Sequence, residues 1–176
     1  LQNYFVTTGE RGAADAAEQR RQRARLKSAL AGLDADLLGL VEVENNARAA
    51  TDIARLASQA SPGPDYTALG GGDGGDDAIQ VAMAYRPERL ELLAGPLVVH
   101  FKAKVSCPDD GDVDRGQGCW NERRTRQAEA VLAFAEERAA SAGVEAVLLM
   151  GDFNSYAAED PVRHLAEGGF RNLLAD

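Results

Sequence analysis

The part of the chain that says most about chemistry is Gly151-Asp152-Phe153-Asn154, which follows an apolar run ending at Met150. On an extended strand, residues i and i+2 point to the same face. Asp152 and Asn154 can therefore reach one bound ion or phosphoryl group while Phe153 turns toward the core. Such a pair suits metal-assisted phosphate hydrolysis. The same residues also fit a turn with Asx hydrogen bonds, and the pattern alone leaves both interpretations open.

Two further strand ends carry polar side chains that a buried strand would not otherwise accommodate. Glu42 follows the apolar run 37–41, and His100 follows 97–99. Ligand sites of α/β proteins lie at strand ends, so these ends define one pocket if the strands are neighbours. We predict that Glu42 holds a hard cation such as Mg²⁺ and that His100 donates to the phosphate. The Asp/Asn pair would orient the attacking water and the leaving group.

These residues also have ordinary structural explanations. Glu42 could be a strand-end carboxylate and His100 a core histidine with satisfied hydrogen bonds, and His164 fits a structural role on an amphipathic segment. Trp120 and Tyr156 could stack on bases, or they could pack in the core or in loops. The residue types alone do not decide between these explanations.

Composition and charge restrict the function classes. The 176 residues fit a single domain, 1–176, and we expect a monomer. No apolar run approaches the roughly 18 residues of a membrane span, so we expect no membrane partner. The net charge of −9 argues against non-specific binding to a phosphate backbone, which needs clustered Lys and Arg. A phosphodiester substrate would therefore need a metal ion to supply positive charge. The basic clusters at 20–25 and 123–126 have a solvated helix face as their ordinary explanation.

Hydrophobic periodicity predicts alternating helices and strands, which indicates an α/β fold with a mixed sheet. Helices are predicted over 15–32 with Gly32 as C-cap, over 47–60, over 120–141 and from 160 onward. Strands are predicted over 37–41, 79–85, 90–93, 97–101 and 144–150, and the glycine-rich tract 70–75 is predicted to be a flexible loop. These strands must bring the polar ends together.

The two cysteines, Cys107 and Cys119, stand on either side of a loop rich in glycine and aspartate. This spacing suits one disulfide, worth about 3 kcal/mol in the chain-entropy model, and a disulfide implies an oxidising compartment. A zinc site would need two more ligands nearby, and His100 is the only close imidazole. We expect a secreted, extracellular or periplasmic protein.

Three aspartates in this loop fall at the first, third and fifth positions of a calcium-loop pattern: Asp110, Asp112 and Asp114. The pattern then fails, because Arg115 stands in place of the turn glycine and Asn121 in place of the final glutamate. We therefore predict a solvated acidic loop.

Taken in order, seven segments resemble one known family. They are Asn3-Tyr4-Phe5, Glu42-Val43-Glu44-Asn45-Asn46, Asp77-Ala78-Ile79, Tyr85-Arg86-Pro87, His100-Phe101-Lys102, Gly116-Gln117-Gly118-Cys119-Trp120-Asn121 and Gly151-Asp152-Phe153-Asn154. Together they resemble the endonuclease/exonuclease/phosphatase superfamily, and most of all its secreted bacterial extracellular nucleases. Gly-Asp-Phe-Asn marks the superfamily, whereas the segments 116–121 and 152–161 are specific to the nuclease branch. The resemblance covers nearly the whole chain.

The resemblance implies a DNase-I-like fold, a two-layered β-sandwich flanked by helices. It implies metal-dependent cleavage of phosphodiester bonds in DNA or RNA, with Mg²⁺, Mn²⁺ or Ca²⁺ as cofactor. The family's first catalytic asparagine would precede Leu1, and its closing Ser-Asp-His strand would follow Asp176, so we expect the domain to be incomplete at both ends. The alternatives are a phosphomonoesterase, a lipid-headgroup phosphodiesterase, or a catalytically inactive domain that binds a metal or a partner.

The resemblance also implies roles residue by residue. His100 matches the histidine that hydrogen-bonds the scissile phosphate, Asp152 the aspartate that positions the water, and Asn154 the asparagine that stabilises the transition state. Glu42 matches the metal-binding glutamate, with Glu44 the weaker match. The remaining assignments are Asn3 as a second metal ligand, Asn121 and Arg124 as substrate-binding residues, and Cys107 with Cys119 as the disulfide of this branch.

Overall fold

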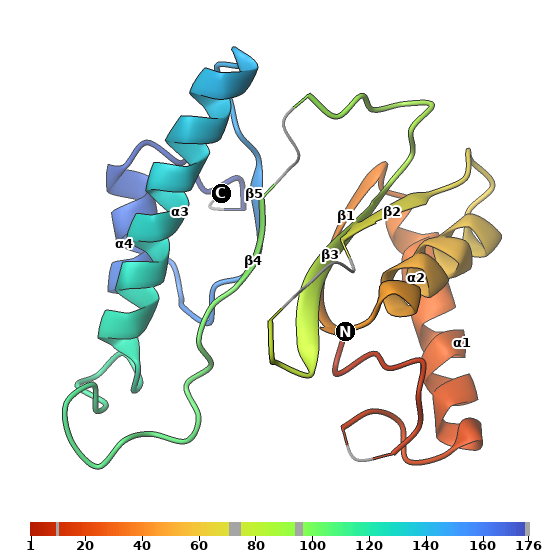
Figure 1. Ribbon diagram of the computed structural model, residues 1–176, viewed down its shortest axis with the longest axis horizontal. Coiled ribbons are helices and arrows are strands. Elements are labelled where there is room, and N and C mark those ends of the chain that lie inside the picture. Colours follow the sequence, from red (N-terminus) through yellow and green to blue (C-terminus); the bar gives the residue numbers. More distant parts are fainter. Residues whose placement is uncertain (10, 71–74, 94–96, 175–176) are drawn as a thin grey trace. The chain divides into compact units, whose positions relative to one another are not determined.

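The computed structural model describes residues 1–9, 11–70, 75–93 and 97–174, and Figure 1 shows its helices and strands. The chain divides into two compact units, Leu1–Leu92 and Leu93–Asp176. Each unit combines helices with one small sheet, antiparallel in the first unit and parallel in the second. These elements agree with the α/β, DNase-I-like domain that the resemblance implies. Among the described residues neither sheet is mixed, so the prediction of a mixed sheet is wrong.

The first unit is a three-stranded antiparallel sheet with two helices. Its elements are α1 (Ala16–Leu33), β1 (Leu37–Glu44), α2 (Ala47–Ala60), β2 (Thr67–Gly70) and β3 (Ile79–Tyr85). The strand order is β1-β3-β2, and α2 packs on all three strands while α1 packs on α2. Glu42 lies near the end of β1. There the strand pairs with β3 on one side and is bridged to the N-terminal segment on the other, through Val43 and Tyr4.

Helix α2 begins and ends where the sequence predicts. The Asn46 side chain caps it by accepting from the N–H groups of Arg48 and Ala49, both at 2.9 Å. Its apolar face is completely buried around Ile53 and is otherwise made largely of alanine, which allows close approach to the sheet. Helix α1 instead runs past Gly32 to Leu33, and its C-cap is Asp34, which takes the left-handed conformation with φ 39°. The prediction of Gly32 as C-cap is wrong, because aspartate also tolerates this conformation.

A buried arginine joins the end of β3 to the end of α1. The Arg86 guanidinium donates to Asp34 Oδ1 at 2.6 Å and to Asp36 Oδ1 at 3.0 Å. It also lies 4.7 Å from the centre of the Tyr66 ring. The hydrogen bond from Arg86 holds the pKa of the Asp34 carboxyl below its ordinary value. Two carboxylates and a ring thus compensate the buried charge, and a Cβ added at Gly63 would lie only 2.9 Å from the guanidinium carbon.

The second unit holds a two-stranded parallel sheet and two helices. Its elements are β4 (Leu97–His100), α3 (Asn121–Ala142), β5 (Leu149–Asp152) and α4 (Asp160–Glu167). Helices α3 and α4 pack against each other, and their shared core is built on Phe101, Ala128 and Leu165. Because β4 and β5 are parallel and in register, their last residues, His100 and Asp152, lie at the same end of the sheet.

The strand predictions need three corrections. Residues 90–93 form no strand. The strand predicted at 144–150 is β5 at Leu149–Asp152, because β5 is only as long as its four-residue partner β4. Strand β2 was not predicted, since four residues ending in glycine give too short a pattern. Of the predicted loop 70–75, residues 71–74 lie outside the described residues.

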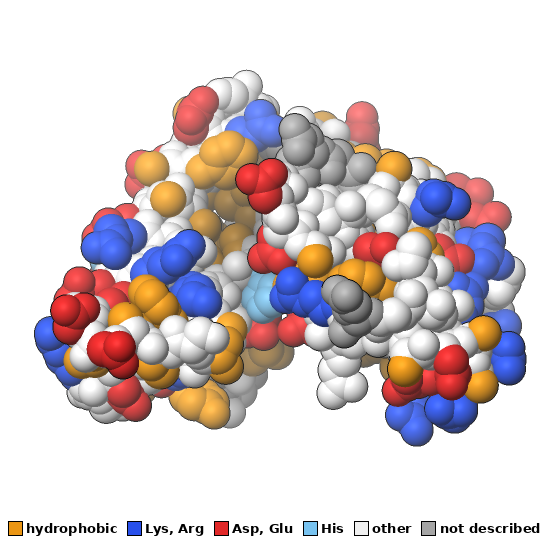
Figure 2. Space-filling model, turned by 60° about the horizontal axis from the view of Figure 1, so that its bottom comes forward, with side chains coloured by type: hydrophobic (Ala, Val, Ile, Leu, Met, Phe, Trp, Pro, Cys, Tyr) orange, Lys and Arg blue, Asp and Glu red, His pale blue; other side chains and the backbone are white. Residues whose placement is uncertain are grey.

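On the face shown in Figure 2, acidic and basic side chains are interspersed over both units, and no broad basic patch is seen on that face. No helix in the described part of the chain has the length and apolarity needed to cross a membrane.

Candidate functional site

The second unit brings His100 and Asp152 side by side. They are register partners in the parallel β4–β5 pair, and they end their strands together. His100 Nε2 lies 4.0 Å from Asp152 Oδ2, and the N–H of Phe101 donates to the Asp152 carbonyl at 2.8 Å. The histidine side chain is 18% exposed and the aspartate side chain 50% exposed. An imidazole and a carboxylate therefore lie side by side where the two strands end, and both are at least partly accessible to solvent.

Asn154 folds back onto the same strand end. Its N–H donates to Asp152 Oδ1 at 2.8 Å, and its Nδ2 donates to the Phe101 carbonyl at 2.9 Å. The Asx turn predicted as the alternative interpretation is therefore present, and it also fixes both side chains. One Asp152 oxygen is held by the turn, while the other faces His100. Phe153 turns to the core, as predicted, with its ring edge-to-face on Phe101 at 5.4 Å between centroids.

The first unit brings Asn3 to Glu42. The N–H of Asn3 donates to Glu42 Oε2 at 2.9 Å, and the N–H of Tyr4 donates to the Glu42 carbonyl at 2.8 Å. A β-bulge between Leu40 and Val43 interrupts the pairing of β1 with β3 at this point. The bulge turns the glutamate carboxylate toward the N-terminal segment, which runs parallel to β1 there.

The backbone is strained at three of the predicted site residues. Asn3, Glu42 and Asn154 have φ values of 56°, 57° and 47°. Positive φ is uncommon for residues other than glycine, and such strain clusters at functional sites. For Glu42 the strain is the more notable, because glutamate lacks the preference that asparagine has for this conformation.

Glu44 is occupied by structural hydrogen bonds. Its carboxylate accepts from the Val6 N–H at 2.7 Å, the Thr7 hydroxyl at 2.7 Å and the Thr7 N–H at 3.2 Å. Burial alone would raise the pKa of the Glu44 carboxyl, but these hydrogen bonds outweigh burial and the pKa is lowered. Glu44 therefore fastens the N-terminal segment to β1, whereas the Glu42 carboxylate accepts one hydrogen bond from the described residues.

The donors in the first unit suit a hard cation. A Glu42 carboxylate and an Asn3 amide offer oxygen ligands, and Mg²⁺ commonly takes only one or two protein carboxylates and keeps several waters. Among the described residues, no three His, Cys, Asp or Glu side chains gather closely enough to hold a metal ion. Glu42 and Asn3 belong to a different unit from His100, Asp152 and Asn154, and the single site predicted from all five stays a prediction.

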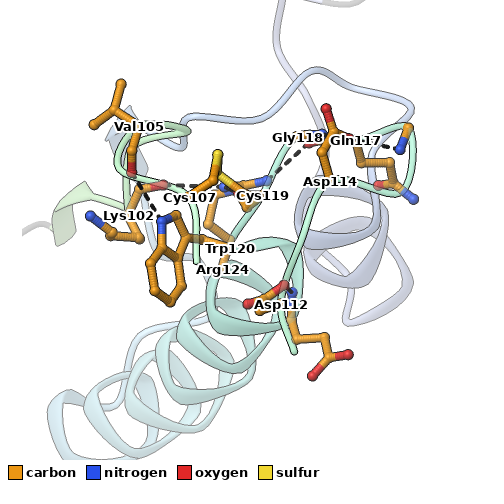
Figure 3. Close-up of a disulfide and its surroundings, with 12 residues drawn as sticks. Lys102, Val105, Cys107, Asp112, Asp114, Gln117, Gly118, Cys119, Trp120 and Arg124 are labelled. Carbon is orange, nitrogen blue, oxygen red and sulfur yellow. Dashed lines mark hydrogen bonds between the residues drawn. A yellow bond between two sulfur atoms is a disulfide. The ribbon is translucent and has the colours of Figure 1, made fainter. Parts of the chain in front are cut away.

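A disulfide-closed loop precedes α3 in the second unit. Cys107 and Cys119 are bonded, which confirms the predicted pair, and Figure 3 shows the loop around them. Arg124 lies beneath the loop and is completely buried. It donates to the carbonyls of Cys119, Gln117 and Lys102 at 2.7, 3.0 and 3.3 Å, and to the Ser155 hydroxyl at 3.1 Å.

These contacts change the interpretation of Arg124. A solvated helix face is wrong for this residue, because its guanidinium joins the disulfide loop to Lys102, just after β4, and to Ser155 in the turn after β5. Burial lowers the pKa of the guanidinium, although Glu159 and Asp112 oppose this effect. A substrate-binding role for Arg124 stays a prediction, and its described contacts are internal.

Asn121 is likewise held in a local network. Its Nδ2 donates to Asp160 Oδ2 at 2.9 Å, as does Gln117 Nε2. The N–H of Asp160 in turn donates to Gln117 Oε1 at 2.8 Å. The first residue of α3 is thereby tied to the first residue of α4, and the predicted contact of Asn121 with substrate stays a prediction.

A family comparison gives this arrangement its context. A sequence model of the Endonuclease/Exonuclease/phosphatase family matches residues 9–175. The chain belongs to this family. The family assignment makes it a phosphate-ester hydrolase in class, and most such hydrolases depend on a divalent metal. The searches of curated proteins and of solved structures found no match.

Three groups of residues near the site were not predicted from the sequence. Tyr4 and Arg23 both donate to Asp52, and burial together with this hydrogen bond raises the pKa of the Tyr4 hydroxyl. Lys104 Nζ lies 2.6 and 2.7 Å from the Glu159 oxygens. Lys102 follows His100 closely, and only the motif His-Phe-Lys could have drawn attention to it.

Two aspartates of the acidic loop accept hydrogen bonds from backbone N–H groups. Asp112 Oδ1 and Oδ2 accept from the N–H groups of Glu122 and Arg123 at 3.0 and 2.9 Å, so Asp112 caps α3 in place of Trp120. Asp114 Oδ1 accepts from Gly116 and Gly118 at 2.8 and 2.9 Å. The failed calcium-loop pattern thus contains aspartates that hold backbone amides. Burial raises the pKa of Asp112, but the two helix amides outweigh it and the pKa is lowered.

Replacing Asp112 by Ala is expected to lower the free energy of unfolding by roughly 1 kcal/mol at neutral pH, the usual cost of losing an N-cap. Since the folded-state pKa lies below the ordinary value of 3.8, this contribution is complete above that pH and disappears as the pH falls through the folded pKa. Urea unfolding across this range measures it, with the exposed Asp110→Ala as control. A difference that does not shrink in acid contradicts the capping role.

Proposed function

We propose that this chain is a metal-dependent nuclease that cleaves phosphodiester bonds in nucleic acid. The observation that carries the proposal is the joint strand end of His100 and Asp152, to which the Asn154 turn adds a third polar group. Family membership supports hydrolysis of a phosphate ester. The segments 116–121 and 152–161, typical of the nuclease branch, favour a diester over a monoester.

The geometry of the second unit suggests a catalytic role for each of its three polar side chains. Asp152 Oδ1 is fixed by the Asn154 N–H, so its partly exposed carboxylate is oriented to accept a proton from an attacking water. His100 Nε2 can donate to a phosphate oxygen as negative charge develops, and Asn154 supplies an amide at the same place. A divalent cation, held through Glu42 and Asn3, would stabilise negative charge as a Lewis acid.

Hydrolysis assays test this proposal directly. Purified protein with Mg²⁺, Mn²⁺ or Ca²⁺ should cleave plasmid DNA, single-stranded DNA or RNA, and EDTA should stop the reaction. Bis-p-nitrophenyl phosphate and p-nitrophenyl phosphate distinguish a diesterase from a monoesterase. Cleavage of the monoester alone would favour the phosphatase alternative, and inactivity on every substrate with every metal would favour a catalytically inactive domain.

We also propose that the protein works in an oxidising compartment, outside the cytoplasm, because its only two cysteines form one disulfide. Intact-mass analysis of the protein isolated from its native host should show no alkylation by iodoacetamide before reduction and two alkylated cysteines after it. Alkylation of both thiols without reductant would reject this compartment.

A further inference from the structure

Two lysines that follow His100 each lie over an aromatic ring. Lys102 Nζ is 5.3 Å from the centre of the Trp120 ring, and Lys104 Nζ is 5.1 Å from that of Tyr156. Tyr156 follows Asn154 by two positions and is 78% exposed. A large aromatic side chain that is so exposed beside polar residues is a common element of nucleic-acid binding surfaces.

Trp120 is held rigidly although it is not buried. It takes a left-handed conformation, with φ 65°, between the disulfide at Cys119 and the start of α3. Its N–H donates to the Asp112 carbonyl at 2.9 Å, and its Nε1 donates to the Val105 carbonyl at 3.0 Å. Figure 3 shows the indole anchored by Val105 with Lys102 beside it. A ring that is already fixed loses little conformational entropy when a ligand stacks on it.

Internal hydrogen bonds tie both aromatic pairs to the His100–Asp152 strand end. Arg124 donates to the Lys102 carbonyl and to the Ser155 hydroxyl, and Ser155 directly precedes Tyr156. Asn154 Nδ2 donates to the carbonyl of Phe101, the residue before Lys102. The two aromatic pairs are thus built onto the same β4 and β5 ends that present His100 and Asp152.

The two lysines differ in their charge environment. Lys104 is paired with Glu159, so its charge is compensated locally. Lys102 has no carboxylate within 4.0 Å in the described part of the chain. Lys102 therefore remains available for an anionic ligand.

We propose that Lys102, Trp120 and Tyr156 form a subsite for unpaired nucleotides. Bases stack on the two rings, and Lys102 binds a backbone phosphate next to the one presented to His100. The inference rests on the proposed nuclease function and adds a substrate class to it, namely single-stranded nucleic acid. In a duplex the base faces are already stacked on each other, so they are not available to stack on these two rings. Stacking also suits a protein of net charge −9, since it does not need a broad basic surface.

Trp120 is the only tryptophan of the chain, so tryptophan emission, excited at a wavelength that the four tyrosines do not absorb, reports on this subsite alone. Titration with oligothymidylate in EDTA, where the strand is not cleaved, should quench the tryptophan emission. The matching DNA duplex should produce a smaller change at equal concentration. Absence of an emission change at concentrations that bind labelled oligothymidylate would overturn the proposal, and so would absence of binding.

Variants provide a second measurement that does not depend on Trp120. Tyr156→Ala and Lys102→Gln should each weaken oligothymidylate binding, measured by fluorescence anisotropy, by about ten-fold. Phe134→Ala is the matched control, because Phe134 is also exposed, at 46%, and also lies under a cation, with Arg138 at 5.3 Å. Its binding should be unchanged. Equal binding by wild type and the two test variants would overturn the subsite.

Cleavage assays separate this inference from the function on which it rests. If the wild type cleaves DNA and Tyr156→Ala raises the KM for single strands with little change in kcat, the subsite is supported. If the wild type cleaves and both test variants keep the wild-type KM, the subsite is wrong while the nuclease function stands. If the wild type hydrolyses no diester, the proposed function itself fails.

Discussion

Asp152→Asn is expected to lower metal-dependent cleavage by about 10²- to 10³-fold while the protein remains folded. The substitution keeps the size of the side chain and an oxygen that can accept from the Asn154 N–H, so the turn at the end of β5 should persist. It removes the negative charge that, in the proposed mechanism, orients the water and accepts its proton. Plasmid cleavage measures the rate, and circular dichroism checks the fold. The exposed Asp110→Asn is the matched control and should keep full activity.

His100→Ala should have an effect of similar size, because it removes the proposed donor to the developing negative charge. The double variant should lose less than the product of the two single losses, since residues that serve one transition state fail together. A loss equal to the product of the two single losses would argue that the two side chains, 4.0 Å apart, act in separate steps. Near wild-type turnover by a folded Asp152→Asn would show that the Asp-Phe-Asn turn is only structural.

The local elements were largely predictable because their signals are local. Helix α2 has a capping asparagine before it and a Ser-Pro-Gly-Pro stop after it, and it spans the predicted residues 47–60. Phe153 packs in the core, as the i and i+2 rule predicted. The extended strand through Asn154 is wrong, because β5 ends at Asp152 and Asn154 has a φ of 47°. The turn that the sequence left open as the alternative is what brings Asn154 back to Asp152.

The long-range features were not predictable from spacing. Arg124 stands in a basic helical run that indicates a solvated face, but tertiary packing places it beneath the disulfide loop, where backbone carbonyls compensate its burial. The sequence gives no sign of which helical arginine will be buried. Strand β5 is shorter than its apolar run, because its partner β4 limits the ladder. The positive φ of Glu42 depends on a bulge that no single-sequence pattern encodes.

The second large effect concerns cation binding at Glu42, which lies in the bulge of β1 between Leu40 and Val43. Glu42→Gln is expected to weaken Mg²⁺ binding by at least about ten-fold, the loss seen even when only a partner of a metal ligand is removed. The amide that replaces the carboxylate still offers an oxygen but no charge, and a hard cation depends on both. Cleavage at low Mg²⁺ should fall strongly and should recover in part when Mg²⁺ is raised.

Glu44→Gln provides the matched control, because it makes the same chemical change two positions away on the same strand. The Glu44 carboxylate holds Val6 and Thr7, so this variant should lose stability rather than metal affinity. Since the folded-state pKa of Glu44 lies below 4.5, the stability difference should be full at neutral pH and should shrink as the pH falls through the folded pKa. Calorimetric Mg²⁺ titration and urea unfolding of both variants separate the two roles. If Glu42→Gln binds Mg²⁺ as the wild type does, Glu42 is not a ligand, and the strain at its backbone serves only to seat the N-terminal segment against β1.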